Sequence, residues 1–158
     1  MKKVVASAII TVIAASFLSV YFMSTGLVAS DYAVESYMVT RIVDGDTVVL
    51  ENGDVVRLLS IDTPERGKKC YKEASARLSD MILLKEVNIE RDIEDKDRYK
   101  RSLRYIFQNG SFVNEELVRE GYAYLYFVEP NTKYNTLLKE AAQEAKTKRS
   151  GCLWNQSA

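Results

Sequence analysis

The feature that most limits the fold is a series of three short runs of alternating, often β-branched residues. The runs are Tyr37–Val43, Thr47–Leu50 and Val55–Ile61. Asn52-Gly53, the strongest short signal for a hairpin, separates the second run from the third. Asp44-Gly45 separates the first run from the second and indicates a turn or bulge. The pattern predicts three strands in an antiparallel meander.

The rest of the chain shows two more strand patterns and three helical ones. Alternation predicts two strands, Glu86–Arg91 and Tyr99–Phe107. Helical periodicity predicts two helices, Tyr71–Leu84 and Tyr134–Lys148. Asn114 suits the N-cap of a further helix that ends at Gly121. These elements predict an α+β fold, a five-stranded Greek-key β-barrel (OB-fold) with three packed helices.

The N-terminus differs in composition from the rest of the chain. Lys2 and Lys3 precede an uncharged run over residues 4–23, which is roughly long enough to span a bilayer as a hydrophobic helix. A positive start followed by an apolar stretch is typical of an export signal, and Val28-Ala29-Ser30 offers small residues for cleavage. A cleaved signal peptide and a retained membrane anchor both fit this segment.

These features divide the chain into three parts. We expect a signal peptide or anchor over residues 1–30, a linker over 31–36 and a domain over 37–158. The domain holds nearly all of the charged residues and is long enough to bury a core of its own. With Lys2 and Lys3 inside, it would be secreted or anchored on the extracytoplasmic side of the membrane.

The chain has two cysteines, Cys70 and Cys152. Two cysteines in an oxidising compartment most often pair, so export predicts a disulfide between them. Such a bond would tie an early loop to the C-terminus. The alternative is a pair of free thiols.

The absence of histidine excludes several common kinds of active site. Neither a Ser-His-Asp triad nor a Cys-His pair can form, and two cysteines cannot complete a zinc site of the usual Cys/His type. The 22 basic and 22 acidic residues balance, which argues against binding to nucleic acid through bulk positive charge. The charges are nevertheless unevenly placed, because residues 66–72 and 98–104 are basic and residues 86–97 are rich in acids.

Four acidic residues lie at turns of the predicted meander: Asp44, Asp46, Asp62 and Glu65. Because the start of the second strand lies beside the end of the third, we expect Asp46 and Asp62 to come within reach of each other. Adjacent carboxylates repel unless a positive charge lies between them. Carboxylate and carbonyl oxygens suit Ca²⁺ or Mg²⁺, so the cluster is a candidate metal site. The alternative is that these acids only form turns.

Two arginines are placed to act with these carboxylates. Arg57 lies within the third predicted strand, and Arg101 lies near the start of the fifth. A guanidinium group on a rigid strand is well suited to bind phosphate. The offset from Arg57 to Asp62 places them on opposite faces of an ideal strand, so a bulge or loop must bring them together. The alternative for each arginine is a surface salt bridge.

Five segments of the chain carry a specific resemblance. They are Val43-Asp44-Gly45-Asp46-Thr47-Val48, Arg57-Leu58-Leu59-Ser60-Ile61-Asp62-Thr63-Pro64-Glu65, Glu73-Ala74-Ser75, Asp97-Arg98-Tyr99-Lys100-Arg101-Ser102-Leu103 and Val113-Asn114-Glu115-Glu116-Leu117-Val118-Arg119-Glu120-Gly121. Together they resemble staphylococcal nuclease (thermonuclease) and its relatives, in order from about Tyr37 to Trp154. The resemblance implies an OB-fold and a calcium-dependent phosphodiesterase that cuts DNA and RNA with little sequence preference, leaving 3′-phosphate ends.

The resemblance also implies which residues bind the metal and activate water. Asp46 and Asp62 would bind Ca²⁺ through their carboxylates, and Thr63 through its backbone carbonyl. Asp44 would support this metal site. Glu65 would orient and deprotonate the attacking water, as a carboxylate base in a chain without histidine.

The resemblance assigns the phosphate and the nucleotide to other side chains. Arg57 and Arg101 would bind the phosphate and stabilise charge as the phosphorus becomes five-coordinate. Tyr99 and Arg98 would help to hold the nucleotide, where Arg98 replaces a lysine of the family and keeps its charge.

The resemblance is less regular at two points, and a third position matches the family. Lys100 and Ser102 stand where the family usually has small glycines. A second tyrosine that contacts the nucleotide aligns with either Tyr126 or Phe127, and we prefer Tyr126 because it keeps the side-chain type. Glu129-Pro130 matches a position where the family can have a cis peptide bond.

Two other interpretations remain open at this stage. A non-catalytic OB-type module that binds oligonucleotides or other partners would have the same fold, and a calcium-stabilised surface protein would account for the acids alone. A full set of acids and arginines at the matching positions favours the nuclease. We therefore expect an exported, monomeric, calcium-dependent nuclease whose substrates are DNA and RNA.

Overall fold

The computed structural model describes residues 35–155. The predicted signal or anchor over residues 1–30, with its apolar run over 4–23, lies outside the described residues. Within the described range, no helix is long and apolar enough to cross a membrane. The first strand begins at Glu35, so the last two residues of the expected linker already belong to the folded domain.

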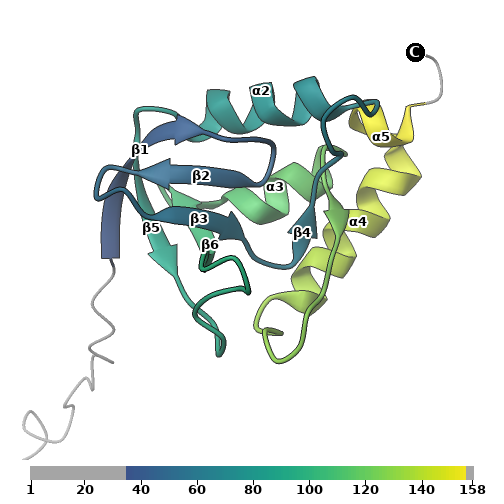
Figure 1. The fold of residues 1–158 in the computed structure, drawn as a ribbon. Helices are drawn as coiled ribbons and strands as arrows, with labels where there is room; N and C mark the ends of the chain where they lie inside the picture. Colours follow the sequence, from purple (N-terminus) through teal and green to yellow (C-terminus); the bar gives the residue numbers. More distant parts are fainter. Residues whose placement is uncertain (1–34, 156–158) are drawn as a thin grey trace, which may run out of the picture. The chain divides into compact units, whose positions relative to one another are not determined.

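Five strands form a closed barrel (Figure 1). They are β1 (Glu35–Ile42), β2 (Thr47–Leu50), β3 (Val55–Leu58), β5 (Glu86–Glu90) and β6 (Ser102–Gln108). The first three form the predicted antiparallel meander, β5 pairs with β1, and β6 pairs with β5. A parallel pairing of β3 with β6, which sets Arg57 opposite Leu103, closes the barrel. The predicted five-stranded barrel is confirmed.

The third predicted strand, Val55–Ile61, is interrupted. The strand ends at Leu58. Ser60 then has a φ of 63°, a left-handed conformation that residues with a side chain seldom adopt. β4 (Ile61–Asp62) then pairs with β8 (Tyr124–Leu125) outside the barrel. An ideal strand would place Arg57 and Asp62 on opposite faces. The interruption changes the direction of the backbone between them, so the two side chains can meet.

Three helices pack on the barrel: α2 (Tyr71–Ile82), α3 (Val113–Arg119) and α4 (Asn135–Lys148). Figure 1 shows α2 beside the meander and α3 between the barrel and α4. A two-residue strand, β7 (Ser111–Phe112), and a short helix, α5 (Gly151–Trp154), were not predicted. Each main helix buries an apolar face in the core, as Leu78 of α2, Leu117 of α3 and Leu138 of α4 illustrate.

Asn114 was wrongly predicted to cap α3, which begins one residue earlier, at Val113. The Asn114 side chain is fully buried, and its Nδ2 donates a hydrogen bond to the Leu59 carbonyl at 2.9 Å. Its Oδ1 accepts a hydrogen bond from the Ile106 backbone N–H at 3.0 Å. The residue therefore fastens α3 to β6 and to the break that follows β3.

The C-terminal part is fixed at two points, to the turn after α3 and to the loop before α2. Gly121 and Gly151 both have positive φ, and a Cβ at Gly121 would lie 2.1 Å from the Ser150 carbonyl oxygen, so the close backbone contact requires glycine. The predicted disulfide joins Cys70, just before α2, to Cys152 in α5. The Glu129–Pro130 peptide bond is cis.

Candidate active site

The first part of the site is the turn that carries Asp46. This residue is 5% exposed, and its Oδ2 accepts hydrogen bonds from the Thr63 backbone N–H at 2.8 Å and the Thr63 hydroxyl at 3.0 Å. A Cβ at Gly45 would lie 2.7 Å from Thr63 Oγ1. The glycine between Asp44 and Asp46 therefore lets this turn approach the loop after β4 closely enough to form those bonds.

Arg57 lies between two of the predicted metal ligands. Its Nε is 3.2 Å from Asp46 Oδ1, and its Nη2 is 2.8 Å from Asp62 Oδ1. Its Nη1 donates hydrogen bonds to the carbonyls of Leu58 and Ile61, both at 2.8 Å. Asp46 and Asp62 are thus brought together as expected, and the positive charge between them comes from Arg57, most of whose N–H groups face oxygens of the protein itself.

Arg101 lies in a turn before β6, not on a strand that begins at Tyr99 as predicted. Lys100 has a φ of 65°, so the extended backbone of a strand cannot run through it. Arg101 Nε donates a hydrogen bond to Asp97 Oδ2 at 2.7 Å. Its two terminal nitrogens have no protein partner among residues 35–155, so both are available to a ligand.

Asp97 holds this turn together and was not predicted as part of the site. Its Oδ1 accepts hydrogen bonds from the backbone N–H groups of Tyr99 at 2.9 Å and Arg101 at 3.0 Å. Burial raises the pKa of its carboxyl, but the hydrogen bonds and charge of Arg101 outweigh burial and hold the pKa below the usual value. Aspartate followed two residues later by a bonded N–H is a common turn, so the pattern Asp97-Arg98-Tyr99 contained this signal.

Aromatic side chains border the site on two sides. Tyr99 is 65% exposed, and the guanidinium carbons of Arg98 and Arg101 lie 4.8 and 5.6 Å from its ring centroid. Tyr126 is exposed and borders the same pocket, and its backbone N–H donates a hydrogen bond to the Ser60 carbonyl. Phe127 packs instead against the hydrophobic core. Of the two aligned candidates, the structure places Tyr126 at the pocket.

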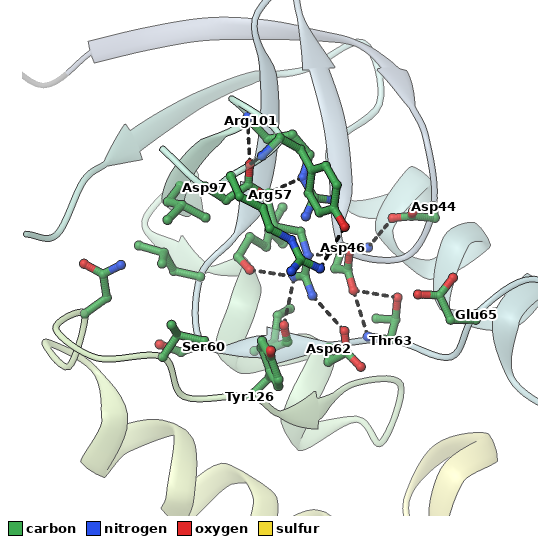
Figure 2. A pocket seen from close by; sticks show the side chains of 18 of the residues that line it. Asp44, Asp46, Arg57, Ser60, Asp62, Thr63, Glu65, Asp97, Arg101 and Tyr126 are labelled. Atoms are coloured by element: carbon green, nitrogen blue, oxygen red, sulfur yellow. Dashed lines mark hydrogen bonds and ion pairs between the residues drawn. The ribbon is translucent and has the colours of Figure 1, made fainter. Parts of the chain in front are cut away.

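One pocket of about 700 Å³ brings the predicted residues together (Figure 2). Every predicted metal, catalytic and nucleotide-binding residue lines it: Asp44, Asp46, Arg57, Asp62, Thr63, Glu65, Arg98, Tyr99, Arg101 and Tyr126. Figure 2 shows Arg57 among the carboxylates, with Arg101 and Asp97 on one side and Glu65 on another. The volume is in the range of sites for small organic ligands.

Two carboxyl groups of the pocket, those of Asp62 and Asp44, have a raised pKa. Burial raises the pKa of Asp62, and the nearby charges of Asp46 and Glu65 raise it further against the opposing effect of Arg57. Burial and the charge of Asp46 likewise raise the pKa of Asp44. Raised values mean that the ionised carboxylates are destabilised where they stand, so an added cation would be favoured.

The chemistry of these groups fits a hard divalent cation. Within residues 35–155, no three Asp, Glu or Cys side chains converge as a complete metal site. Calcium, however, commonly completes its shell of oxygen ligands with backbone carbonyls and water. Two carboxylates and a neighbouring carbonyl therefore form a suitable partial set.

Comparison with known proteins agrees with this arrangement. Residues 55–156 match the family model described as staphylococcal nuclease homologue. The chain is 35% identical over 161 residues to the Thermonuclease of Staphylococcus hyicus, which covers 92% of this chain and 94% of that protein. The chain belongs to the staphylococcal nuclease family. The predicted family is thereby confirmed, and the barrel is its OB-fold.

Two other relatives have a similar sequence identity to this chain. The Thermonuclease of Staphylococcus intermedius is 35% identical over 130 residues, covering 77% of each chain. Endonuclease YncB of Bacillus subtilis (strain 168) is 38% identical over 128 residues, covering 74% of this chain and 60% of that protein.

Proposed function

We propose that this chain is a calcium-dependent nuclease that hydrolyses phosphodiester bonds of DNA and RNA with little sequence preference, leaving 3′-phosphate ends. The observation that carries the proposal is the presence, in one pocket, of a carboxylate cluster and of Arg101 with its terminal nitrogens unengaged among the described residues. A bound cation and a guanidinium group together offset the charge of a phosphodiester. Relatives named thermonuclease and endonuclease support the same class of activity.

The metal site would use the carboxylates of Asp46 and Asp62 and the backbone carbonyl of Thr63. Asp44 would support it, since its Oδ1 accepts a hydrogen bond from the Asp46 backbone N–H at 3.2 Å. Calcium bound there would supply the positive charge that favours a more highly charged transition state at phosphorus.

Glu65 would act as the general base. It is exposed and lines the pocket three residues after Asp62, in a chain that has no histidine. Its carboxylate would take a proton from the water that attacks phosphorus, while the bond from phosphorus to the 5′ oxygen breaks and that oxygen takes a proton from solvent water. The products would be a 3′-phosphate and a 5′-hydroxyl.

The two arginines would differ in what they do. Arg101 would donate its free terminal N–H groups to the phosphate as charge develops in the transition state. Arg57 would hold Asp46 and Asp62 in place and contribute its charge to the same phosphate. Tyr99, Arg98 and Tyr126 would hold the sugar and base at the edge of the pocket.

An assay of the full chain on denatured DNA tests this function. We expect cleavage with calcium present and its loss after a chelator is added, with products that polynucleotide kinase labels directly because their 5′ ends are hydroxyls. Cleavage that a chelator leaves unchanged would refute the metal dependence. Oligonucleotide binding without any hydrolysis would support the alternative, a non-catalytic OB-type binding module.

We also propose that the protein is exported and acts as a monomer. Export is supported by the basic start and the apolar run in residues 1–30. Cell fractionation with N-terminal sequencing tests export: a mature chain that begins near Asp31 indicates a cleaved signal, and an intact chain in the membrane fraction indicates an anchor. An intact chain confined to the cytoplasmic fraction would contradict export.

A further inference from the structure

A second surface groove adjoins the candidate active site and has no role in the mechanism above. It lies between the end of β1 and α2 and has a volume of about 540 Å³. Its polar lining comes from Arg41, Lys72 and Tyr71 and from the hydroxyl-bearing residues Thr40, Ser75 and Ser79. No acidic residue lines it within the described part of the chain.

The two cations of this groove are not neutralised by the protein. Arg41 and Lys72 are both exposed, and neither forms a side-chain hydrogen bond or ion pair with another residue of the range 35–155. By contrast, Arg77 is paired with Glu120, and Arg104 is paired with Asp95. A groove with two unpaired cations and no acid is suited to a polyanion.

The groove and the active-site pocket border each other. Tyr71, at the start of α2, lines both. After β1, Val43 lines the groove and the next residue, Asp44, lines the pocket. A strand that extends out of the pocket past Tyr71 would reach the groove.

We propose that this groove binds the phosphates of a nucleic-acid strand that flank the bond to be cut. Arg41 and Lys72 contact phosphate oxygens, and Tyr71, which lines both hollows, offers an aromatic ring on which a base can stack. The inference rests on the proposed nuclease function and narrows its substrate class to strands longer than the pocket can hold. It also explains how a chain with zero net charge attracts nucleic acid locally.

Matched double variants of the full chain test the groove. Arg41→Gln with Lys72→Gln removes both of its charges. Arg91→Gln with Arg149→Gln is the control, because these arginines are exposed and border neither the pocket nor the groove. Circular dichroism melting confirms that each variant is folded. Fluorescence anisotropy in chelator then gives the Kd of a labelled single-stranded 12-mer without cleavage.

The groove variant is expected to bind the 12-mer about tenfold more weakly than wild type. The reason is that two phosphate contacts, each contributing about 0.7 kcal/mol to the binding free energy, are lost. The slope of log K against log salt should fall in magnitude by about 1.4, since each phosphate neutralised on a single strand contributes about 0.7. In calcium, its kcat/KM for a dinucleotide should stay within about twofold of wild type. The control variant should keep the wild-type salt slope.

Three results would overturn the proposal. The first is a similar loss of 12-mer affinity in both double variants, which would assign the effect to net charge. The second is a parallel loss of activity on the dinucleotide, which would place the effect at the pocket. The third is a wild-type protein that binds the 12-mer no more tightly than a dinucleotide. Binding of the 12-mer through the groove in a protein that never cleaves would refute the nuclease function and leave the groove intact.

Discussion

Arg57 and Arg101 line the same pocket but are held in opposite ways. Arg57 comes from the barrel, its side chain is 11% exposed, and its guanidinium group contacts two carboxylates and two backbone carbonyls. Arg101 comes from a turn, its side chain is 32% exposed, and only its Nε is bonded, to Asp97. One arginine is part of the protein framework, and the other presents its terminal nitrogens to the pocket.

This difference shows that residue type alone does not define a role in a site. The parallel pairing of β3 with β6 and the break at Ser60 fix Arg57 where Asp46 and Asp62 meet. Arg101 depends on one carboxylate for its position, so its guanidinium group can be directed at a ligand. We expect loss of Arg57 to damage fold and activity together, and loss of Arg101 to damage activity alone.

Arg57→Ala should have the largest effect. It leaves the buried carboxylate of Asp46 without its cation, which should lower the free energy of unfolding by about 3 kcal/mol. Activity should fall by about 10³-fold or more, because the charge of Arg57 and the placement of Asp62 are lost together. Urea denaturation and initial rates on denatured DNA measure the two effects. A variant with wild-type stability would show that Arg57 is not part of the framework.

Arg101→Ala should lose about 10²–10³-fold in kcat, since a donor to the transition state is removed. Its free energy of unfolding should change by less than about 1 kcal/mol, because the pair with Asp97 is partly exposed. Arg101→Lys should recover little activity, since the forked donor is lost. Near-normal rates in both variants would remove Arg101 from the mechanism.

Asp97→Asn should lower kcat by about tenfold with little change in KM, since Arg101 would remain but lose the charged partner that directs it. Asp95→Asn is the matched control, because Asp95 pairs with Arg104, and neither of these two residues borders the pocket. Steady-state kinetics on a 12-mer compares the two variants. Equal kcat values would contradict a positioning role for Asp97.

The smallest expected effect is a pH dependence of stability. The pKa of Asp97 in the fold lies below its usual value of 3.8, so its ionised form stabilises the fold above that pH. The contribution disappears as the pH falls through the lower, folded value. Urea unfolding from pH 3 to pH 7 should therefore show wild type and Asp97→Asn converging toward the acid end. A constant difference over this range would mean that the Arg101–Asp97 pair adds no stability.

The local sequence pattern was sufficient to predict most of the strands and helices. Alternation and Asn52-Gly53 predicted the meander, and apolar periodicity predicted α2 and α4. The short elements β4, β8 and α5 were missed because two to four residues carry no measurable periodicity. β6 was predicted to start at Tyr99, three residues too early. The alternation of residues 99–107 is typical of a strand, but the backbone of Lys100 is left-handed.

The residues of the site and the approach of Asp46 to Asp62 were predicted, but most of the other contacts in the site were not. The acids and arginines were identifiable from their types and from the family resemblance. The pairing of β3 with β6 and the turn at Ser60 depend on contacts between distant parts of the chain. Tyr126 was preferred over Phe127 from its side-chain type, and its place at the pocket depends on such contacts too. Asp97 was overlooked because it was considered only as part of the acidic stretch over residues 86–97, although it forms three bonds within its own turn.

The central claim is that Glu65 activates water in a calcium-dependent nuclease. Its most direct test is the single-turnover cleavage rate of a 12-mer by wild type and by Glu65→Gln, with enzyme and calcium saturating. We predict measurable cleavage by wild type and a rate about 10²–10⁴-fold lower in the variant, with 12-mer affinity unchanged. Equal rates in the two proteins, or no cleavage by wild type with calcium present, would contradict the claim.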